Sequence, residues 1–204
     1  TAASTLNHSA DGLTVLGGAV TDGKPTTSEG DVTVQNGASL TISQAANAHG
    51  ASWRAGDLIV NGATVDFNQA NSTGNLTVNL EKATLRFTNP NATPGNLSGT
   101  ADGSKIIATG ATANSLNFST INLNNSTVDT DGDVGVYEGQ NVNMTGTSSI
   151  TADELYTKNS NSATGAPKVS GGTITADIVS APESTTDNKI PGMEINGSSV
   201  DGSV

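Results

Sequence analysis

The sequence contains no cysteine, few aromatic residues and few basic side chains. The absence of cysteine excludes disulfide bonds and thiolate metal sites. Aromatic residues make up only 3% of the 204 residues, so any core must be thin and aliphatic. Lysine and arginine total 8 against 19 acidic residues, and the formal net charge of −11 repels phosphate backbones and anionic lipids. We therefore expect no nucleic-acid partner.

Long apolar stretches are also missing. No run approaches the roughly 18 apolar residues that a membrane-spanning helix needs, and we expect no membrane insertion. Charged residues make up 13% of the chain, about half of the usual share, so polar uncharged side chains must keep its surface hydrated.

Short runs of alternating apolar residues fill much of the chain. In GDLIVNGATVDF, residues 56–67, they lie on both sides of Asn61-Gly62. GDVTVQNGASLTI, from Gly30, and GNLTVNLEKATLRF, from Gly74, have the same form. A period of two is typical of half-buried β-strands, and no stretch shows a sustained helical period. The sequence predicts an all-β fold.

Equivalent apolar positions recur along the chain at intervals of roughly 18 to 27 residues, the scale of a solenoid repeat. These positions are Val32, Leu58, Leu76, Leu97, Leu116, Val142 and Val169. Asn61-Gly62 can be the corner between two strands of one coil, or the tight turn of a hairpin in an antiparallel β-sandwich. The thin aliphatic core and the variable turn lengths favour a short right-handed parallel β-helix with extended termini over the sandwich.

The periodic pattern also divides the chain. We predict a β-helix domain over residues 13–180, preceded by an N-terminal arm or cap over residues 1–12. Residues 181–204 contain two prolines and only isolated apolar side chains, which indicates an extended C-terminal tail or linker.

One acidic segment is a candidate metal site. The sequence DTDGD places Asp129, Asp131 and Asp133 at alternate positions, a spacing at which carboxylates in a turn can converge on Ca²⁺. An EF-hand loop is not formed, because Val134 stands at its glycine position and Gln140 at its closing glutamate position. The alternative is an acidic turn in contact with solvent. Calcium is the only cofactor that the sequence suggests.

The single tryptophan adjoins an arginine. Trp53 and Arg54 could stack on a sugar, and the alternative is that the ring covers the end of an apolar stack. The two histidines, His8 and His49, belong to no recognisable metal or nucleophile motif. We therefore predict no catalytic residues and no enzymatic activity.

The segments GDVTVQNGASLTI, GDLIVNGATVDF, GNLTVNLEKATLRF and NVNMTGTSSITAD resemble the passenger regions of bacterial autotransporters and the related filamentous-haemagglutinin-type exoproteins. The resemblance covers residues 30–180 and lies in pattern and composition rather than in a signature motif. It implies a β-helix that is secreted or held on the bacterial cell surface. It also implies an adhesive or structural module whose partner is a cell-surface glycan or protein.

Two other functions remain open. About seven coils at the usual strand spacing make a rod of roughly 35 Å, which is short for such a passenger. This favours a self-assembling subunit of a surface layer, filament or virion decoration, whose partners are copies of itself. A carbohydrate-active enzyme on a β-helix is the further alternative.

Overall fold

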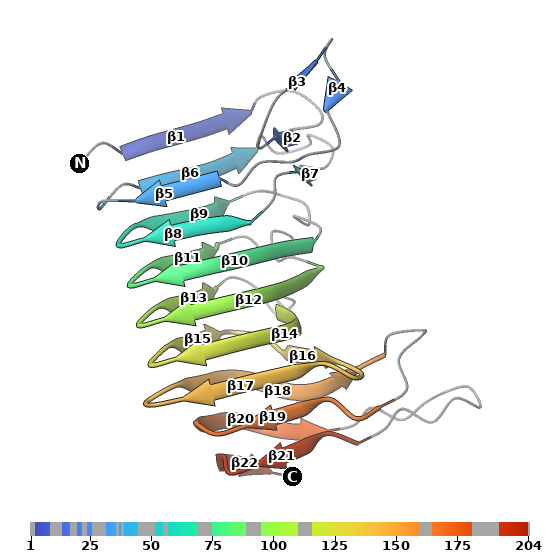
Figure 1. Cartoon of the computed structure of the whole chain (residues 1–204). Helices are drawn as coiled ribbons and strands as arrows, with labels where there is room; N and C mark the ends of the chain where they lie inside the picture. The colour runs from blue at the N-terminus through green and yellow to red at the C-terminus, as the bar shows by residue number, and fades with distance from the viewer. Residues whose placement is uncertain are drawn as a thin grey trace.

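The computed structural model is an all-β, right-handed parallel β-solenoid (Figure 1). It describes residues 3–8, 14–16, 20–21, 24–25, 32–35, 37, 39–44, 52–54, 57–68, 75–88, 95–109, 116–159, 165–180 and 192–203. No helix is present in these ranges, so none of their segments is a helix able to cross a membrane.

Each coil contributes one strand to a front face and one to a back face (Figure 1). The front face consists of β5 (Val32–Gln35), β8 (Leu58–Asn61), β10 (Asn75–Glu81), β12 (Asn96–Asp102), the second half of β14 (Leu116–Asn124), β17 (Asn141–Thr145), β19 (Lys168–Ser170) and β21 (Glu194–Asn196). The back face consists of β1 (Ala3–His8), β6 (Ser39–Gln44), β9 (Thr64–Asn68), β11 (Thr84–Phe87), β13 (Lys105–Ala108), β15 (Thr127–Thr130), the first part of β18 (Ser149–Lys158), the first part of β20 (Thr173–Ser180) and β22 (Ser199–Ser203).

The coils from β14 onward contain an additional strand segment, and these segments form a third face. The start of β14 pairs with β16 (Val134–Tyr137), and β16 pairs with the end of β18. Outside the solenoid ladder, β2 (Thr14–Leu16) pairs in parallel with β7 (Ser52–Arg54). The strands β3 (Val20–Thr21) and β4 (Lys24–Pro25) form an antiparallel pair.

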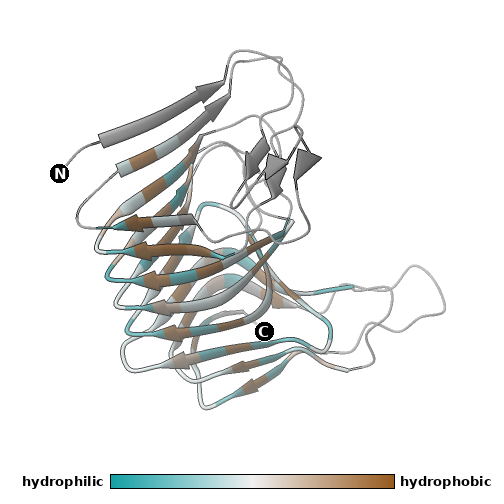
Figure 2. Ribbon diagram, turned by 45° about the horizontal axis from the view of Figure 1, so that its top comes forward, coloured by the Kyte–Doolittle hydropathy of each residue, from teal (hydrophilic) through white to brown (hydrophobic). Residues whose placement is uncertain are grey.

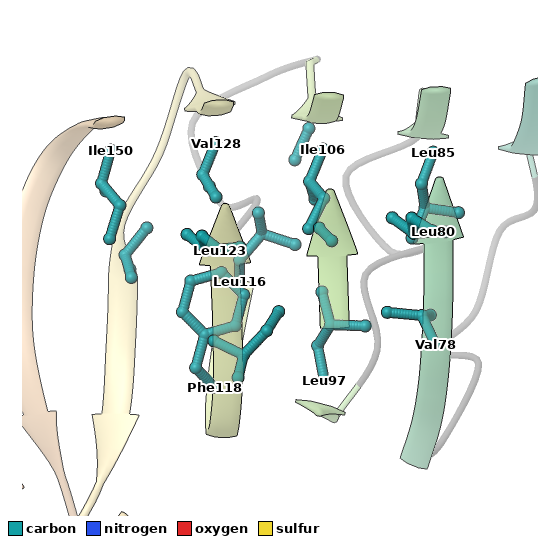
Figure 3. Close-up of a cluster of buried hydrophobic side chains, with 14 of the residues drawn as sticks. Val78, Leu80, Leu85, Leu97, Ile106, Leu116, Phe118, Leu123, Val128 and Ile150 are labelled. Atoms are coloured by element: carbon teal, nitrogen blue, oxygen red, sulfur yellow. The ribbon is translucent and has the colours of Figure 1, made fainter. Parts of the chain in front are cut away.

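The parallel register stacks aliphatic residues of successive coils on one another inside the solenoid. Along the back face, Leu85 pairs with Ile106, Ile106 with Val128 and Val128 with Ile150, and all four are buried. Figure 3 shows these side chains in one row across successive strands. Brown and teal residues alternate along the front-face strands in Figure 2, as the period of two predicts. The core is therefore a narrow aliphatic column, to which Phe67 and Phe87 add one stacked ring pair.

The pairing also decides the role of Asn61-Gly62. The strands β8 and β9 pair with strands of neighbouring coils, each in parallel, so the Asn-Gly step is a corner and not a hairpin. Gly62 has φ 55°, and its N–H donates to Glu81 O at 2.8 Å in the next coil. Asn125, at the equivalent corner two coils beyond Glu81, has φ 46°. The corner thus requires a left-handed backbone conformation, which Gly and Asn adopt at low cost. Lys82 adopts it at the corner of the coil after that of Gly62, with φ 47°.

Buried serine hydroxyls follow the corner from coil to coil. The N–H of Ala83 donates to Ser104 Oγ at 3.0 Å, that of Ser104 to Ser126 Oγ at 3.0 Å, and that of Ser126 to Ser148 Oγ at 3.2 Å. The three serines are at most 2% exposed. Each hydroxyl satisfies a backbone donor that the turn would otherwise bury without a partner.

The two predicted terminal segments contribute strands to the ladder. Within residues 1–12, β1 pairs with β6 at the N-terminal end of the back face. Within residues 181–204, β21 pairs with β19 and β22 pairs with β20, which adds a coil beyond residue 180.

Candidate binding face

Both tyrosines of the chain lie on the third face. Leu116, Val134 and Leu155 pair in register and are fully buried, so the residue that follows each of them points outward. Those outward positions hold Asn117, Gly135 and Tyr156, one from each of three successive coils. The backbone register thus brings an amide, a glycine and an aromatic ring into one line.

Tyr156 crosses over the glycine of the coil before it. Its Oη donates to Asn117 Oδ1 at 3.4 Å, a partner 39 residues earlier and two coils away. A Cβ atom built on Gly135 would meet Asn117 Oδ1 and the Cζ and Oη atoms of Tyr156, all at 2.9 Å. Gly135 is buried while Tyr156 is half-buried. The ring therefore lies against the backbone of Gly135, where a larger residue would force the Tyr156 ring or the Asn117 side chain to move.

Tyr137, in β16, is also held by a hydrogen bond from its hydroxyl to an earlier coil. Its Oη donates to Gly95 O at 2.9 Å, 42 residues earlier, and its ring is half-buried. Lys158, its register partner in β18, places Nζ 5.6 Å from the ring centroid. Burial raises the pKa of Tyr137 and lowers that of Lys158. The lysine amine is thus held beside an aromatic ring and partly shielded from water.

The two rings form a fixed unit that we name the tyrosine platform, made of Asn117, Gly135, Tyr137, Tyr156 and Lys158. The tyrosines stand one strand and two residues apart, which places their Cα atoms roughly 8 Å from each other at ordinary strand spacings. Both rings are held by a hydroxyl bond to an earlier coil. A change of either side chain to another χ1 rotamer would break such a bond, so the platform is pre-organised.

The front face differs from the platform because its outward side chains bond to one another. Asn143 Nδ2 donates to Asn122 Oδ1 at 2.8 Å, and Asn124 Nδ2 donates to Asp102 Oδ1 at 2.8 Å. Thr145 Oγ1 donates to Asn124 Oδ1 at 3.0 Å. These ladders use polar groups internally and offer no aromatic ring, so the front face is less suited than the platform to hold a ligand.

The three aspartates of the predicted calcium site occupy different surroundings. Asp129 is exposed on β15 of the back face, and Asp131 and Asp133 follow that strand. Burial raises the pKa of Asp133, and the nearby carboxylates of Glu154 and Asp153 raise it further. No three His, Asp or Glu side chains among the described residues are grouped so that they could hold a metal ion. Calcium binding therefore stays a prediction that the geometry does not support.

The predicted sugar-stacking pair lies near the N-terminal end. Trp53 and Arg54 belong to β7, whose backbone pairs with β2, but their side chains lie outside the part of the chain that the structure describes. The platform was not predicted from the sequence. The available signal was that the only two tyrosines, Tyr137 and Tyr156, are about one coil apart.

Comparisons of the chain with known protein families, with curated proteins and with solved structures find no match.

Proposed function

We propose that this chain is an exported module of a bacterial cell surface that acts in adhesion and has no catalytic activity. The observation that carries the proposal is the tyrosine platform, in which two half-buried rings are fixed on the outside of a rigid ladder. Tyrosine is enriched at protein binding surfaces, because it buries a large area at a small cost in conformational entropy.

The scaffold supports this proposal through its rigidity. Backbone groups of each coil bond to the next, so the platform needs little ordering when a partner binds. The export part of the proposal rests on the parallel β-solenoid itself, the architecture that the resemblance to autotransporter passengers implies. The acidic, cysteine-free composition is compatible with that location.

An adhesion assay tests the proposal. Beads coated with the folded protein are incubated with a panel of bacterial and epithelial cells and counted after washing. We expect adhesion above that of albumin-coated beads, and its loss in the double variant Tyr137→Ala/Tyr156→Ala. The matched control is Asn122→Ala/Asn143→Ala on the front face, which should adhere as the wild type does. Wild-type beads that adhere no better than albumin-coated beads refute the proposal.

Antibody labelling addresses the location separately. Intact source cells should bind an antibody against the folded protein without permeabilisation. Labelling that appears only after permeabilisation contradicts the cell-surface part of the proposal and leaves the binding activity to be judged by the bead assay.

A second candidate function is self-assembly from end to end. The C-terminal coil carries Met193, Ile195 and Val200, which pack on the core but remain partly exposed. The outer edge of β22 pairs with no described strand, and β1 forms the opposite end of the same back face (Figure 1). A second copy could continue the parallel ladder there in a head-to-tail contact.

Light scattering over a wide range of protein concentrations tests this second candidate. Self-assembly predicts a mass that grows with concentration, and Ile195→Asp should hold the protein as a monomer. A monomeric wild type throughout the range excludes it.

A further inference from the structure

We propose that Asn196-Gly197 is a site of spontaneous modification, at which Asn196 loses its side-chain amide and becomes aspartate and isoaspartate. Asn-Gly steps occur in the chain at residues 36–37, 61–62 and 196–197. The hydrogen bonds of the ladder distinguish the last of these steps from Asn61-Gly62. The proposal is independent of the adhesive function.

The reaction needs only these two residues and water. The backbone N of Gly197 gives up its proton and attacks Cγ of Asn196, so that an N–Cγ bond forms, the Cγ–Nδ2 bond breaks and ammonia leaves. Water then opens the cyclic imide at Cγ, which gives aspartate, or at the backbone carbonyl carbon, which gives isoaspartate. Nothing is oxidised or reduced. Glycine favours the ring closure because it has no Cβ to obstruct the attacking nitrogen.

At the inner corners of the solenoid, the next coil holds the attacking nitrogen. The N–H of Gly62 donates to Glu81 O at 2.8 Å, and the N–H of Gly37 donates to Gly62 O at 2.8 Å. The side chain of Asn61 is held as well, because its Nδ2 donates to Glu81 Oε2 at 3.1 Å. Ring closure at Asn61 must break both of its bonds to Glu81, so the ladder protects this step.

Asn196-Gly197 forms the same corner in the last coil that the structure describes. Gly197 has φ 68°, close to the 55° of Gly62, and a Cβ at either glycine would meet nothing within 4 Å. Asn196 O accepts the N–H of Gly171 from the preceding coil at 2.9 Å, as Glu81 O accepts that of Gly62. In a trans peptide the N–H points opposite to the C=O, so the Gly197 N–H faces away from that coil, where no described residue accepts it. Both residues of the step are exposed to water.

The modification would change this end of the solenoid. Isoaspartate lengthens the backbone by one carbon atom at the corner between β21 and β22. Both products also place a negative charge on the same side of β21 as Glu194, two residues earlier. These changes fall on the end that the second candidate function uses for its head-to-tail contact.

Peptide mass spectrometry of the folded 204-residue chain compares the two steps in one sample. The protein is kept at mildly alkaline pH and at a concentration where light scattering shows monomers. Samples are then digested with pepsin in acid, which stops further ring closure. We expect Asn196 to be lost at least about five-fold faster than Asn61, because Asn61 must first break two hydrogen bonds. Fragmentation by electron transfer should identify isoaspartate at residue 196.

The unfolded chain is the matched control. The two steps have similar neighbours, Val60 and Ala63 around one and Ile195 and Ser198 around the other. In concentrated urea both asparagines should therefore be lost at similar rates, so that any difference in the folded protein comes from the fold.

Hydrogen exchange measures the two glycine amides directly. The Gly197 amide should exchange faster than the Gly62 amide, which is bonded to the next coil. Two results overturn the proposal: loss of Asn196 that is no faster than that of Asn61 in the folded monomer, or a Gly197 amide that exchanges as slowly as that of Gly62.

Discussion

Gly99 offers the sharpest test of the parallel coil-on-coil packing. It lies in β12 with φ 117°, at the point where the register between β12 and β14 shifts. A Cβ atom at this position would overlap the carbonyl oxygen of Val78 and would lie 2.9 Å from its N and 3.0 Å from its C. These are backbone atoms of the preceding coil, so no side-chain rotation can relieve the overlap. The ladder itself must move in Gly99→Ala.

The cost can be estimated from two terms. A residue with a side chain in this sparsely populated backbone region costs about 1–3 kcal/mol. Loss of two ladder hydrogen bonds at about 0.5–1.5 kcal/mol each adds about 1–3 kcal/mol. The expected loss is therefore about 2–6 kcal/mol, a large share of the roughly 5–15 kcal/mol that stabilises an ordinary domain.

Gly62 supplies the matched control. It has φ 55°, and a Cβ there would meet nothing within 4 Å, so Gly62→Ala should cost only the backbone term of about 1–2 kcal/mol. Gly62→Asn should cost less, because Asn125 already adopts this conformation. Urea unfolding followed by far-ultraviolet circular dichroism gives the three free energies of unfolding. A Gly99→Ala variant that loses no more stability than Gly62→Ala refutes the coil-on-coil reasoning.

Three further predictions concern other parts of the ladder. Ser126→Ala removes the acceptor of the buried Ser104 N–H and should cost about 1–3 kcal/mol in urea unfolding; an unchanged unfolding midpoint would contradict the role of the serine. Phe87→Ala opens a cavity beside Phe67, whose ring centroid is 5.4 Å away, and should cost about 3–5 kcal/mol, with Phe87→Leu losing clearly less. Asp133→Asn should raise the melting temperature at pH 7: because the folded-state pKa of Asp133 is raised, its ionised form destabilises the fold above that pKa. This gain should vanish below pH 3.8, the usual pKa, where the carboxyl is protonated in both states; a variant no more stable than wild type at pH 7 would be the contrary result.

The solenoid could be predicted because its signal is local and repeated. Alternating apolar residues on both sides of Asn61-Gly62 predicted half-buried strands, and their recurrence predicted the coils. The parallel pairing was inferred from the scarcity of aromatic residues, and the structure confirms it in every strand pair of the main sheet.

The last coil was harder to recognise from the sequence. Ile195 and Val200 lie in short strands after a long segment with two prolines, so the local pattern indicated a tail. These two strands form because β19 and β20 of the preceding coil offer them backbone partners, and this cannot be read from the segment's own residues. A strand whose partner already exists needs little intrinsic preference of its own.

The tyrosine platform could not be predicted because it depends on residues far apart in the chain. The contact between Tyr156 and Asn117 spans 39 residues, and it exists only because Gly135 lies between them in register. The alternate positions of Asp129, Asp131 and Asp133 predicted a calcium site, and that site stays a prediction. The structure adds that the carboxylates of Glu154 and Asp153 lie near Asp133 and raise its pKa, together with burial.

The direction of the backbone ladder has a mechanical consequence. Strands β1 and β22 lie at opposite ends of the solenoid, and the hydrogen bonds between coils run along the line that joins those ends (Figure 1). Tension applied between the ends would load every contact between neighbouring coils equally, so the coils would separate one after another. The unfolding force is therefore set by the weakest contact between two coils. Additional coils would lengthen the reach of such a tether without raising its breaking force.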